Sequence, residues 1–178
     1  MKSTESITVF DPLDLRRALG RFATGVTVVT SCTPDGRRLG VTANSFNTVS
    51  LKPPIVLWSL SDKSPSLASF LAAGHFVVNV LALNQLDLCQ RFSRPALDKF
   101  SGIPFSDGLQ GMPVLDGCAA TIECRIVNHH VVGDHVLFLG QVQRYAYEET
   151  DPLLFCNGQY IQGIELAAHH GMPAPCAG

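Results

Sequence analysis

The pattern of hydrophobic and polar positions predicts three short helices set among many strands. Apolar side chains at helical spacing follow the N-cap residue Asp11 and Pro12, and they predict a helix over 11–23. Similar spacing predicts helices over 66–73, which Gly74 ends, and over 84–92. Runs rich in β-branched and aromatic residues predict strands over 26–31, 39–45, 55–60, 76–81, 118–132 and 135–147, with short final elements over 153–156 and 159–161.

Turn residues between these runs indicate that neighbouring strands are antiparallel. The tetrapeptide 33–36 (TPDG) has the composition of a tight turn, and Gly133-Asp134 suits a two-residue hairpin. Six or seven strands joined in this way favour an antiparallel barrel over a parallel, doubly wound sheet. Because no repeat or linker interrupts the 178 residues, the length predicts one domain.

The sequence predicts a cytoplasmic protein without a membrane segment. The opening MKSTESITVF lacks the apolar core of a signal peptide. Residues 64–86 contain no charged side chain, but Pro65 and Gly74 interrupt them, so a helix followed by a strand is expected there. Six cysteines without CxxC spacing fit buried thiols in a reducing compartment. Cys118, Cys124 and His130 share a face of the expected strand, but six residues span about 20 Å, so no metal site is predicted.

The charged fraction is low, and it points to a partner that covers surface. Charged residues make up 16% of the chain while 46% is hydrophobic, and soluble domains average about 25% charged residues. The net charge of −2 argues against a nucleic-acid footprint. Common nucleotide and hydrolase motifs are also missing, because no GxGxxG, Walker A, GxSxG or HExxH pattern occurs.

Polar residues in unexpected places are the remaining candidates for chemistry. The string 42–45 ends an otherwise apolar strand, where it could bind a flat polar ligand or simply finish a sheet edge. Hydroxyls and Lys63 in 59–64 precede a helix, so they could seat a phosphate or act as a solvated cap. His135 follows the hairpin turn, where it could donate to a carboxamide or phosphate or could face water. The residues alone leave these alternatives open.

Five motifs in order give these residues a family context. They are RFATGVTVVTS (21–31), GVTANSFNTVSLKPP (40–54), SDKSPSL (61–67), GDHVLFLGQV (133–142) and DPLLFCNGQY (151–160). The set resembles the flavin reductase family of two-component flavin-dependent monooxygenases, including the reductase components of phenol and 4-hydroxyphenylacetate hydroxylases. The similarity covers residues 11–163.

The resemblance implies a fold and an activity. The fold is an FMN-binding split barrel, mainly β, antiparallel and Greek-key, with flanking helices; it spans 11–166, between an N-terminal extension (1–10) and a flexible C-terminal tail (167–178). The activity is NAD(P)H:flavin oxidoreductase, with NADH preferred over NADPH and FAD or FMN as the acceptor. The family acts as a homodimer that delivers reduced flavin to a separate oxygenase, so the implied partner for the low-charge surface is a second copy.

The resemblance also implies roles for individual residues. By this resemblance His135 is expected to position the nicotinamide, with Tyr160 near the same pocket. A direct hydride transfer needs no acid or base, so the protein supplies binding and orientation. The expected flavin contacts are, in chain order, Thr42, Ala43, Asn44, Ser45 and Phe46 at the ring, Thr48 and Val49 as a second contact, Lys63, Ser64 and Pro65 at the phosphate, and Ser69 and Phe70 near the flavin tail.

Two other classes stay open at this point. One is a flavin-binding electron carrier on the same barrel, which would bind flavin without oxidising NAD(P)H. The other is a different split-barrel oxidase, such as a relative of pyridoxamine-phosphate oxidase. The residues do not choose between FMN and FAD, or between flavin held tightly and flavin used as a substrate.

Overall fold

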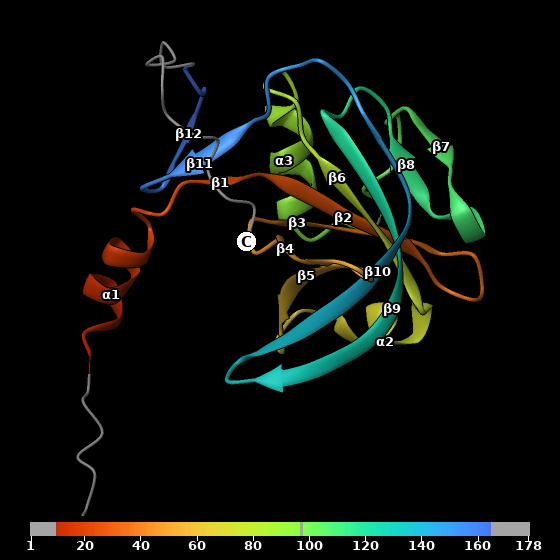
Figure 1. Cartoon of the computed structure of the whole chain (residues 1–178), viewed down its shortest axis with the longest axis horizontal. Coiled ribbons are helices and arrows are strands. Elements are labelled where there is room, and N and C mark those ends of the chain that lie inside the picture. The colour runs from red at the N-terminus through yellow and green to blue at the C-terminus, as the bar shows by residue number, and fades with distance from the viewer. Residues whose placement is uncertain (1–9, 97, 165–178) are drawn as a thin grey trace, which may run out of the picture.

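The computed structural model describes residues 10–96 and 98–164, which form twelve strands and three α-helices (Figure 1). The helices are α1 (Pro12–Leu19), α2 (Leu67–Ala73) and α3 (Leu86–Ser93), and a 3-10 turn covers Leu109–Gly111. The strands are β1 (Thr24–Gly25), β2 (Thr27–Cys32), β3 (Arg38–Ala43), β4 (Asn47–Leu51), β5 (Pro54–Ser61), β6 (His75–Val80), β7 (Phe105–Asp107), β8 (Pro113–Leu115), β9 (Ala120–Val132), β10 (His135–Tyr147), β11 (Leu154–Cys156) and β12 (Gln159–Ile161).

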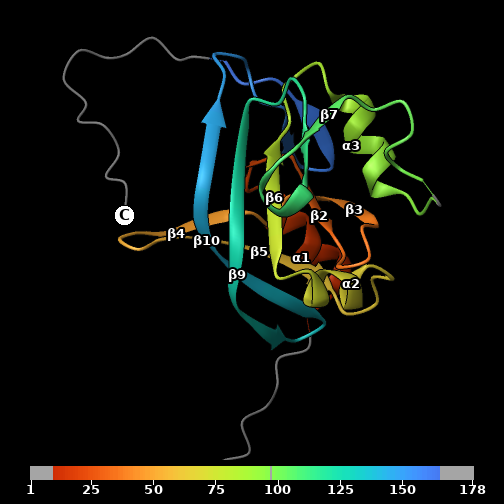
Figure 2. The ribbon, with the colours of Figure 1, turned by 90° about the vertical axis from the view of Figure 1, so that its right-hand side faces the viewer.

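Seven strands form one antiparallel sheet in the order β3-β2-β6-β9-β10-β5-β4. The two edge strands, β3 and β4, are consecutive in the chain and are joined by only residues 44–46. Such a short connection between opposite edges requires the sheet to curl strongly, as Figures 1 and 2 show. Ser45 fastens the connection to β5, since its hydroxyl donates to the Ser59 carbonyl (3.1 Å) and accepts from the Ser59 N–H (2.9 Å).

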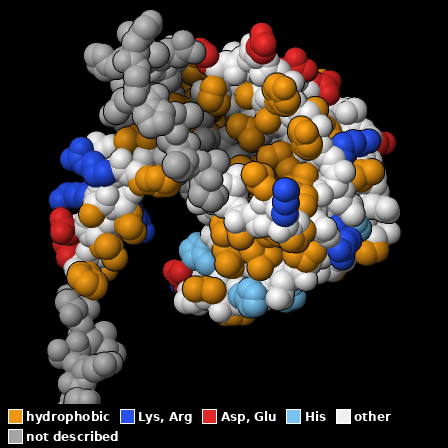
Figure 3. Space-filling model, in the orientation of Figure 1, with side chains coloured by type: hydrophobic (Ala, Val, Ile, Leu, Met, Phe, Trp, Pro, Cys, Tyr) orange, Lys and Arg blue, Asp and Glu red, His pale blue; other side chains and the backbone are white. Residues whose placement is uncertain are grey.

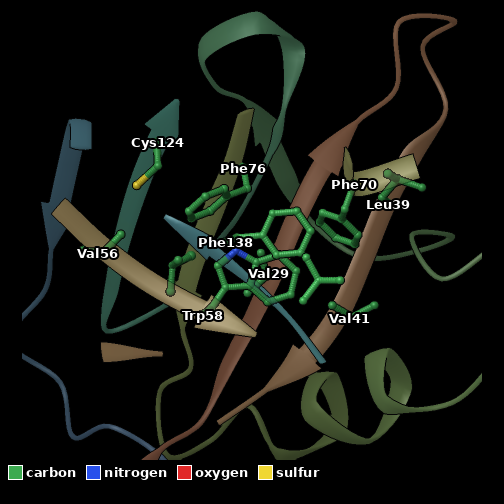
Figure 4. Close-up of a cluster of buried hydrophobic side chains, with 11 residues drawn as sticks. Val29, Leu39, Val41, Val56, Trp58, Phe70, Phe76, Cys124 and Phe138 are labelled. Carbon is green, nitrogen blue, oxygen red and sulfur yellow. The ribbon is translucent and has the colours of Figure 1, made fainter. Parts of the chain in front are cut away.

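The inside of the curled sheet is filled by aromatic side chains (Figure 4). Trp58 on β5 stacks on Phe138 of β10 at 4.8 Å between ring centroids, and Phe70 from α2 meets Trp58 edge-on at 5.1 Å. All three side chains are fully buried. At Gly140 on β10 an added Cβ would lie 2.3 Å from the Phe76 ring, so this position has room only for glycine.

A second apolar cluster joins α3 to the sheet. It contains Val26, Leu81, Cys89, Phe92 and Phe100, among other residues. Gly40 on β3 lets α3 approach closely, because an added Cβ would lie 2.4 Å from the Phe92 ring. In contrast, α1 contributes no buried residue, and Figure 1 shows it standing apart from the sheet.

The antiparallel, mainly β fold with flanking helices is the one the sequence predicts. The hairpin of β9 and β10, the β2–β3 turn and all three helices occur where they are expected. The first helix ends at Leu19 rather than at 23, since residues 24 and 25 pair with β11. Strands β1, β4, β7 and β8 were not predicted. Within the described ranges, every helix is too short or too polar to cross a bilayer.

Candidate functional site

Three neighbouring cavities follow edge strand β3 from its end to its beginning. The first, of about 170 Å³, lies at Thr42, Ala43 and Asn44. The second, of about 270 Å³, includes Val41 and Thr42, and the third, of about 370 Å³, includes residues 36–40. The first two share Thr42, and the last two share Ser66 and Lys99. A row of this kind suits an elongated ligand better than a compact one.

The first cavity is neutral and partly aromatic. Val26, Cys89, Phe155 and Tyr160 complete its wall. Cys89 Sγ and the Tyr160 hydroxyl are hydrogen-bonded at 3.2 Å, and this contact, together with burial, raises the pKa of Tyr160. The bond ties strand β12 to helix α3, so both walls of the cavity are held in place.

The second cavity is lined by hydroxyls and two cations. Ser64, Pro65 and Ser66 come from the turn before α2, while Arg94 and Lys99 follow α3. Lys99 Nζ donates to the carbonyls of Gly40 (3.0 Å) and Phe92 (2.9 Å), and burial lowers the pKa of Lys99. Lys99 therefore fixes the spacing between β3 and α3. Cationic and hydroxyl donors beside one another are suited to an anionic group such as a phosphate.

The structure brings together part of the ring-binding set that the sequence predicts. Thr42, Ala43 and Asn44 line the first cavity. The Thr42 hydroxyl, however, donates to the Cys89 carbonyl at 2.7 Å, and Ser45 is bonded to Ser59. Phe46 packs against the aromatic core. Two hydroxyls that were expected to contact a ligand therefore also hold the cavity walls.

The predicted phosphate and tail residues have separate surroundings. Ser64 and Pro65 line the second cavity. Ser69 accepts a hydrogen bond from Arg37 Nη2 at 2.7 Å. Phe70 lies in the aromatic core with no exposed surface, so its side chain lines none of these cavities.

His135 lies at the hairpin of β9 and β10, next to the turn that carries Lys63. His135 pairs with Ser61 across β10 and β5, and Asp62 N–H donates to the Asp134 carbonyl at 3.0 Å. The hydrogen bond from His135 (2.7 Å) lowers the pKa of Asp134, and the positive charge of Lys63 contributes. Tyr160 instead contacts Cys89 and Phe155. The two residues predicted for the nicotinamide therefore have different neighbours.

Thr48 and Val49 are exposed on β4, at a fourth cavity of about 380 Å³. Thr48 itself is among the lining residues, which are mostly apolar and come from β4, β5, β9 and β10. This cavity shares no lining residue with the row along β3. The fourth cavity therefore lies on the surface of the sheet, apart from the three cavities along β3.

Several lining residues were missed by sequence reasoning. Cys89, Arg94 and Lys99 lie after or within α3, in a region without a recognisable motif, and Arg37 and Arg38 follow a turn. Their positions become meaningful only once α3 packs on β3. The thiols of Cys118 and Cys124 lie elsewhere, and burial raises their pKa to about 12. Among the described residues no group of three or more His, Cys, Asp or Glu side chains is placed to hold a metal.

A family model described as "Flavin reductase like domain" matches residues 19–163. The chain belongs to this family. Flavin reductase relatives include "FMN reductase (NADH) SmoA" from Agrobacterium fabrum, which is 43% identical over 145 residues that cover 82% of both proteins. Another is "Flavin-dependent monooxygenase, reductase subunit HsaB" from Rhodococcus jostii, 41% identical over 93% of this chain and 83% of HsaB. The chain spans only 49% of a longer relative from Rhizobium meliloti, with 41% identity.

Solved flavin reductase structures have the same fold. "Flavin reductase PheA2 in native state" superposes with a TM-score of 0.80 at 38% identity and covers 88% of this chain and all of that chain. SgcE6 of Streptomyces globisporus, an NADH:FAD oxidoreductase solved in complex with NAD and FAD fragments, has a TM-score of 0.79 at 33% identity, with 96% and 99% of the two chains covered. The family assignment made from the five motifs is thereby confirmed.

Proposed function

We propose that the chain is an NAD(P)H:flavin oxidoreductase that supplies reduced FAD or FMN to a separate monooxygenase component. Hydride passes from the reduced nicotinamide, with NADH preferred over NADPH, to the flavin. The reductase names of SmoA, HsaB and SgcE6 support this proposal. We also propose that the fold is an FMN-binding split barrel, and the short connection between the sheet edges β3 and β4 supports it.

The observation that carries the proposal is the change in chemistry along β3. A neutral cavity at Thr42, Ala43 and Asn44 adjoins a cavity that holds hydroxyls and the cations Arg94 and Lys99. A flavin has the same order of parts, because a flat ring with a polar edge is followed by a sugar chain and a phosphate. The residues present therefore fit a flavin whose ring lies at Thr42–Asn44 and whose phosphate lies at Ser64–Ser66.

The chain's own residues bind and orient the reactants. A bound flavin supplies the hydride acceptor. Asn44 and the backbone of 42–46 face its polar edge, while the hydroxyls of Thr42 and Ser45 keep β3 at fixed distances from α3 and β5. Such positioning is what a direct hydride transfer requires, because the reacting atoms must come within about 3–3.5 Å. Lys63, Ser64 and Pro65 are assigned to the phosphate turn.

The nicotinamide is assigned to the space beside the ring cavity, with His135 and Tyr160 as positioning residues. Tyr160 closes one side of the first cavity, where the Cys89 bond fixes its hydroxyl. His135 stands on the hairpin beside Lys63, and we assign it to the nicotinamide as a second positioning residue. This arrangement needs no proton transfer by either residue.

The proposed assembly is a homodimer that buries the apolar sheet surface. Leu51 is 79% exposed, and Tyr145 and Tyr147 are 70% and 73% exposed, around the fourth cavity. Figure 3 shows hydrophobic side chains gathered over the face that β9 and β10 cross. Helix α1 adds Leu13 and Leu19 without burying either. A helix of eight residues is not stable alone in water, so a second copy is the proposed partner. Thr48 and Val49, which are exposed on β4, keep their proposed role as a second flavin contact.

A steady-state assay tests the proposed activity. The purified chain is mixed with NADH or NADPH, with FAD, FMN or no flavin, and loss of the reduced nicotinamide is recorded. Oxidation that requires flavin and runs faster with NADH supports the proposal. Flavin binding without oxidation of either nicotinamide would instead identify an electron carrier. Sedimentation equilibrium of the same sample tests the dimer, which a stable monomer would disprove.

A further inference from the structure

Residue 89 contacts two opposite walls of the first cavity. Cys89 lies in the middle of α3 with no exposed surface. Its carbonyl accepts from the Thr42 hydroxyl of β3 at 2.7 Å, while its Sγ is hydrogen-bonded to the Tyr160 hydroxyl of β12 at 3.2 Å. Strands β3 and β12 belong to different sheets. One residue therefore sets the spacing between the strand assigned to the flavin ring and the aromatic side chain assigned to the nicotinamide.

Tyr160 has two anchors and one open side. Its ring packs on Phe155 of β11, with 5.3 Å between the ring centroids and 59° between the ring planes. Within the described residues its hydroxyl makes a hydrogen bond to Cys89 alone. The residue is still 41% exposed, and it lines the first cavity together with Thr42–Asn44. Without the bond to Cys89, only the contact with Phe155 would hold the ring in place.

The ionisation of Tyr160 reports on this bond in the protein without any ligand. The hydrogen bond to Cys89 is the largest cause that raises the pKa of Tyr160, followed by burial and by the charge of the Cys89 thiolate. Removal of the thiol should therefore lower the pKa of Tyr160 toward its ordinary value. The integrity of the contact can thus be measured independently of turnover.

A direct hydride transfer is sensitive to small displacements of the groups that hold the two reactants. The reacting atoms must come within about 3–3.5 Å, and a misplacement of about 1 Å can slow a reaction about a hundredfold. Cys89 itself contacts no reacting atom, because its side chain is buried behind Tyr160. Its influence on the reaction must therefore pass through the position of Tyr160.

We propose that Cys89 is a positioning residue for hydride transfer, which holds Tyr160 at a fixed distance from the ring-binding strand β3. The inference rests on the proposed function, because it assumes a flavin ring at Thr42–Asn44 and a nicotinamide beside Tyr160. It assigns a role to a residue of α3 that lies outside the five motifs.

Stopped-flow mixing of the flavin-loaded protein with saturating NADH, in the absence of oxygen, measures the rate of hydride transfer. In Cys89→Ala this rate is expected to fall about tenfold, since one of the two anchors of Tyr160 is lost. The bond from Thr42 goes to the backbone carbonyl of residue 89 and persists, so the flavin Kd should stay within about twofold. The KM for NADH should change less than the rate, because Tyr160 still lines the cavity.

Cys89→Ser distinguishes positioning from simple packing. The serine hydroxyl can make the same bond to Tyr160, so this variant should recover most of the lost rate. If residue 89 only filled space, the polar serine would perform no better than alanine in this buried position.

Tyr160→Phe removes the same bond from the partly exposed side, so it tests the link even where Cys89→Ala does not fold. It should slow hydride transfer to a similar extent. Combining Cys89→Ala with Tyr160→Phe should add little, because both changes remove one interaction. Additive losses in the double variant would overturn the inference.

A pH titration of ring-labelled tyrosine by NMR, on the flavin-free protein, supplies the second readout. The signal that disappears in Tyr160→Phe identifies the residue. Cys89→Ala should lower the pKa of Tyr160 because the bond that raises it is lost, and Cys89→Ser should lower it less. An unchanged pKa in Cys89→Ala would show that the thiol does not hold the Tyr160 hydroxyl, and would overturn the inference.

A matched control is Cys124→Ala. Cys124 is as fully buried as Cys89, but it lies in the aromatic core and lines none of the cavities along β3. This variant should leave both the pKa of Tyr160 and the hydride-transfer rate unchanged. A wild-type rate in folded Cys89→Ala, or a rate in Cys89→Ser as low as in Cys89→Ala, would reject the inference alone. Wild-type protein that binds flavin and NADH but transfers no hydride would reject the proposed function as well.

Discussion

A single methyl group added at Gly40 should push apart β3 and α3, the two walls of the cavities proposed to bind the flavin. In Gly40→Ala the new Cβ would lie 2.4 Å and 2.5 Å from two atoms of the Phe92 ring and 3.3 Å from Phe100. Phe92 is 1% exposed, meets Phe100 edge-on at 5.1 Å and lines the second cavity. The added methyl group must therefore push the Phe92 ring into this cavity or shift helix α3 away from β3.

The expected loss of stability is about 2–3 kcal/mol, at the upper end of what overpacking one methyl group costs in a packed core. The shift should also stretch the Lys99 bonds to Gly40 and Phe92 and the Thr42 bond to Cys89. Since those bonds set the width of the first two cavities, FAD affinity should fall about tenfold. Urea unfolding and a flavin titration measure the two effects on the same sample.

Two other glycines provide matched controls. Gly140→Ala places a Cβ 2.3 Å from the Phe76 ring in the aromatic core, so it should destabilise by a similar amount while leaving the flavin Kd within about twofold. Gly25→Ala meets nothing within 4 Å and should change neither quantity. If Gly40→Ala unfolds at the wild-type urea concentration, or loses no more flavin affinity than Gly140→Ala, the reasoning about the α3–β3 wall is wrong.

Three further expectations concern single side chains. His135→Ala should raise the KM for NADH with flavin affinity nearly intact, and NMR titration should show the pKa of Asp134 rising, because the hydrogen bond that lowers it is removed; loss of flavin binding with unchanged NADH kinetics would contradict the assigned role. Lys63→Ala should weaken flavin binding more than it slows turnover at saturating flavin, and an unchanged flavin Kd would count against the phosphate turn. Iodoacetamide at pH 8 should leave Cys118 and Cys124 unmodified in the folded protein, since pKa values of about 12 keep them as thiols; mass spectrometry of the peptides decides this.

Local patterns in the sequence predicted most elements because each carries its own signal. Asp11 and Pro12 start α1, Gly74 adopts the left-handed conformation that ends α2, and Gly133-Asp134 fixes the longest hairpin. Strand β4 lacked such a signal. Its residues 47–51 are mostly exposed and alternate weakly, and it is a strand because β5 provides a hydrogen-bonding edge. That pairing depends on the curl of the whole sheet.

The residues of the candidate site also fall into two groups, those that lie in local motifs and those that only tertiary packing brings in. Thr42, Ala43, Asn44, Ser64 and Pro65 lie within motifs that can be read locally, and they line the first two cavities. Lys99 and Arg94 come from a stretch without periodicity, and they reach the site only because Gly40 permits close packing of α3. No local pattern encodes a contact between residues 40 and 92. The side chain of Phe70, a residue expected near the flavin tail, lies on the face of α2 that fills the core.

Anaerobic reduction of flavin tests the proposed reductase activity most directly. Oxidised FAD is mixed with an equal amount of NADH in the absence of oxygen, with a small catalytic amount of the chain present or absent, and the visible absorbance of the flavin is followed. A flavin reductase should bleach the flavin completely, with one NADH consumed for each FAD, while the mixture without protein changes far more slowly. Flavin that stays oxidised in the presence of the folded, flavin-binding chain would contradict it.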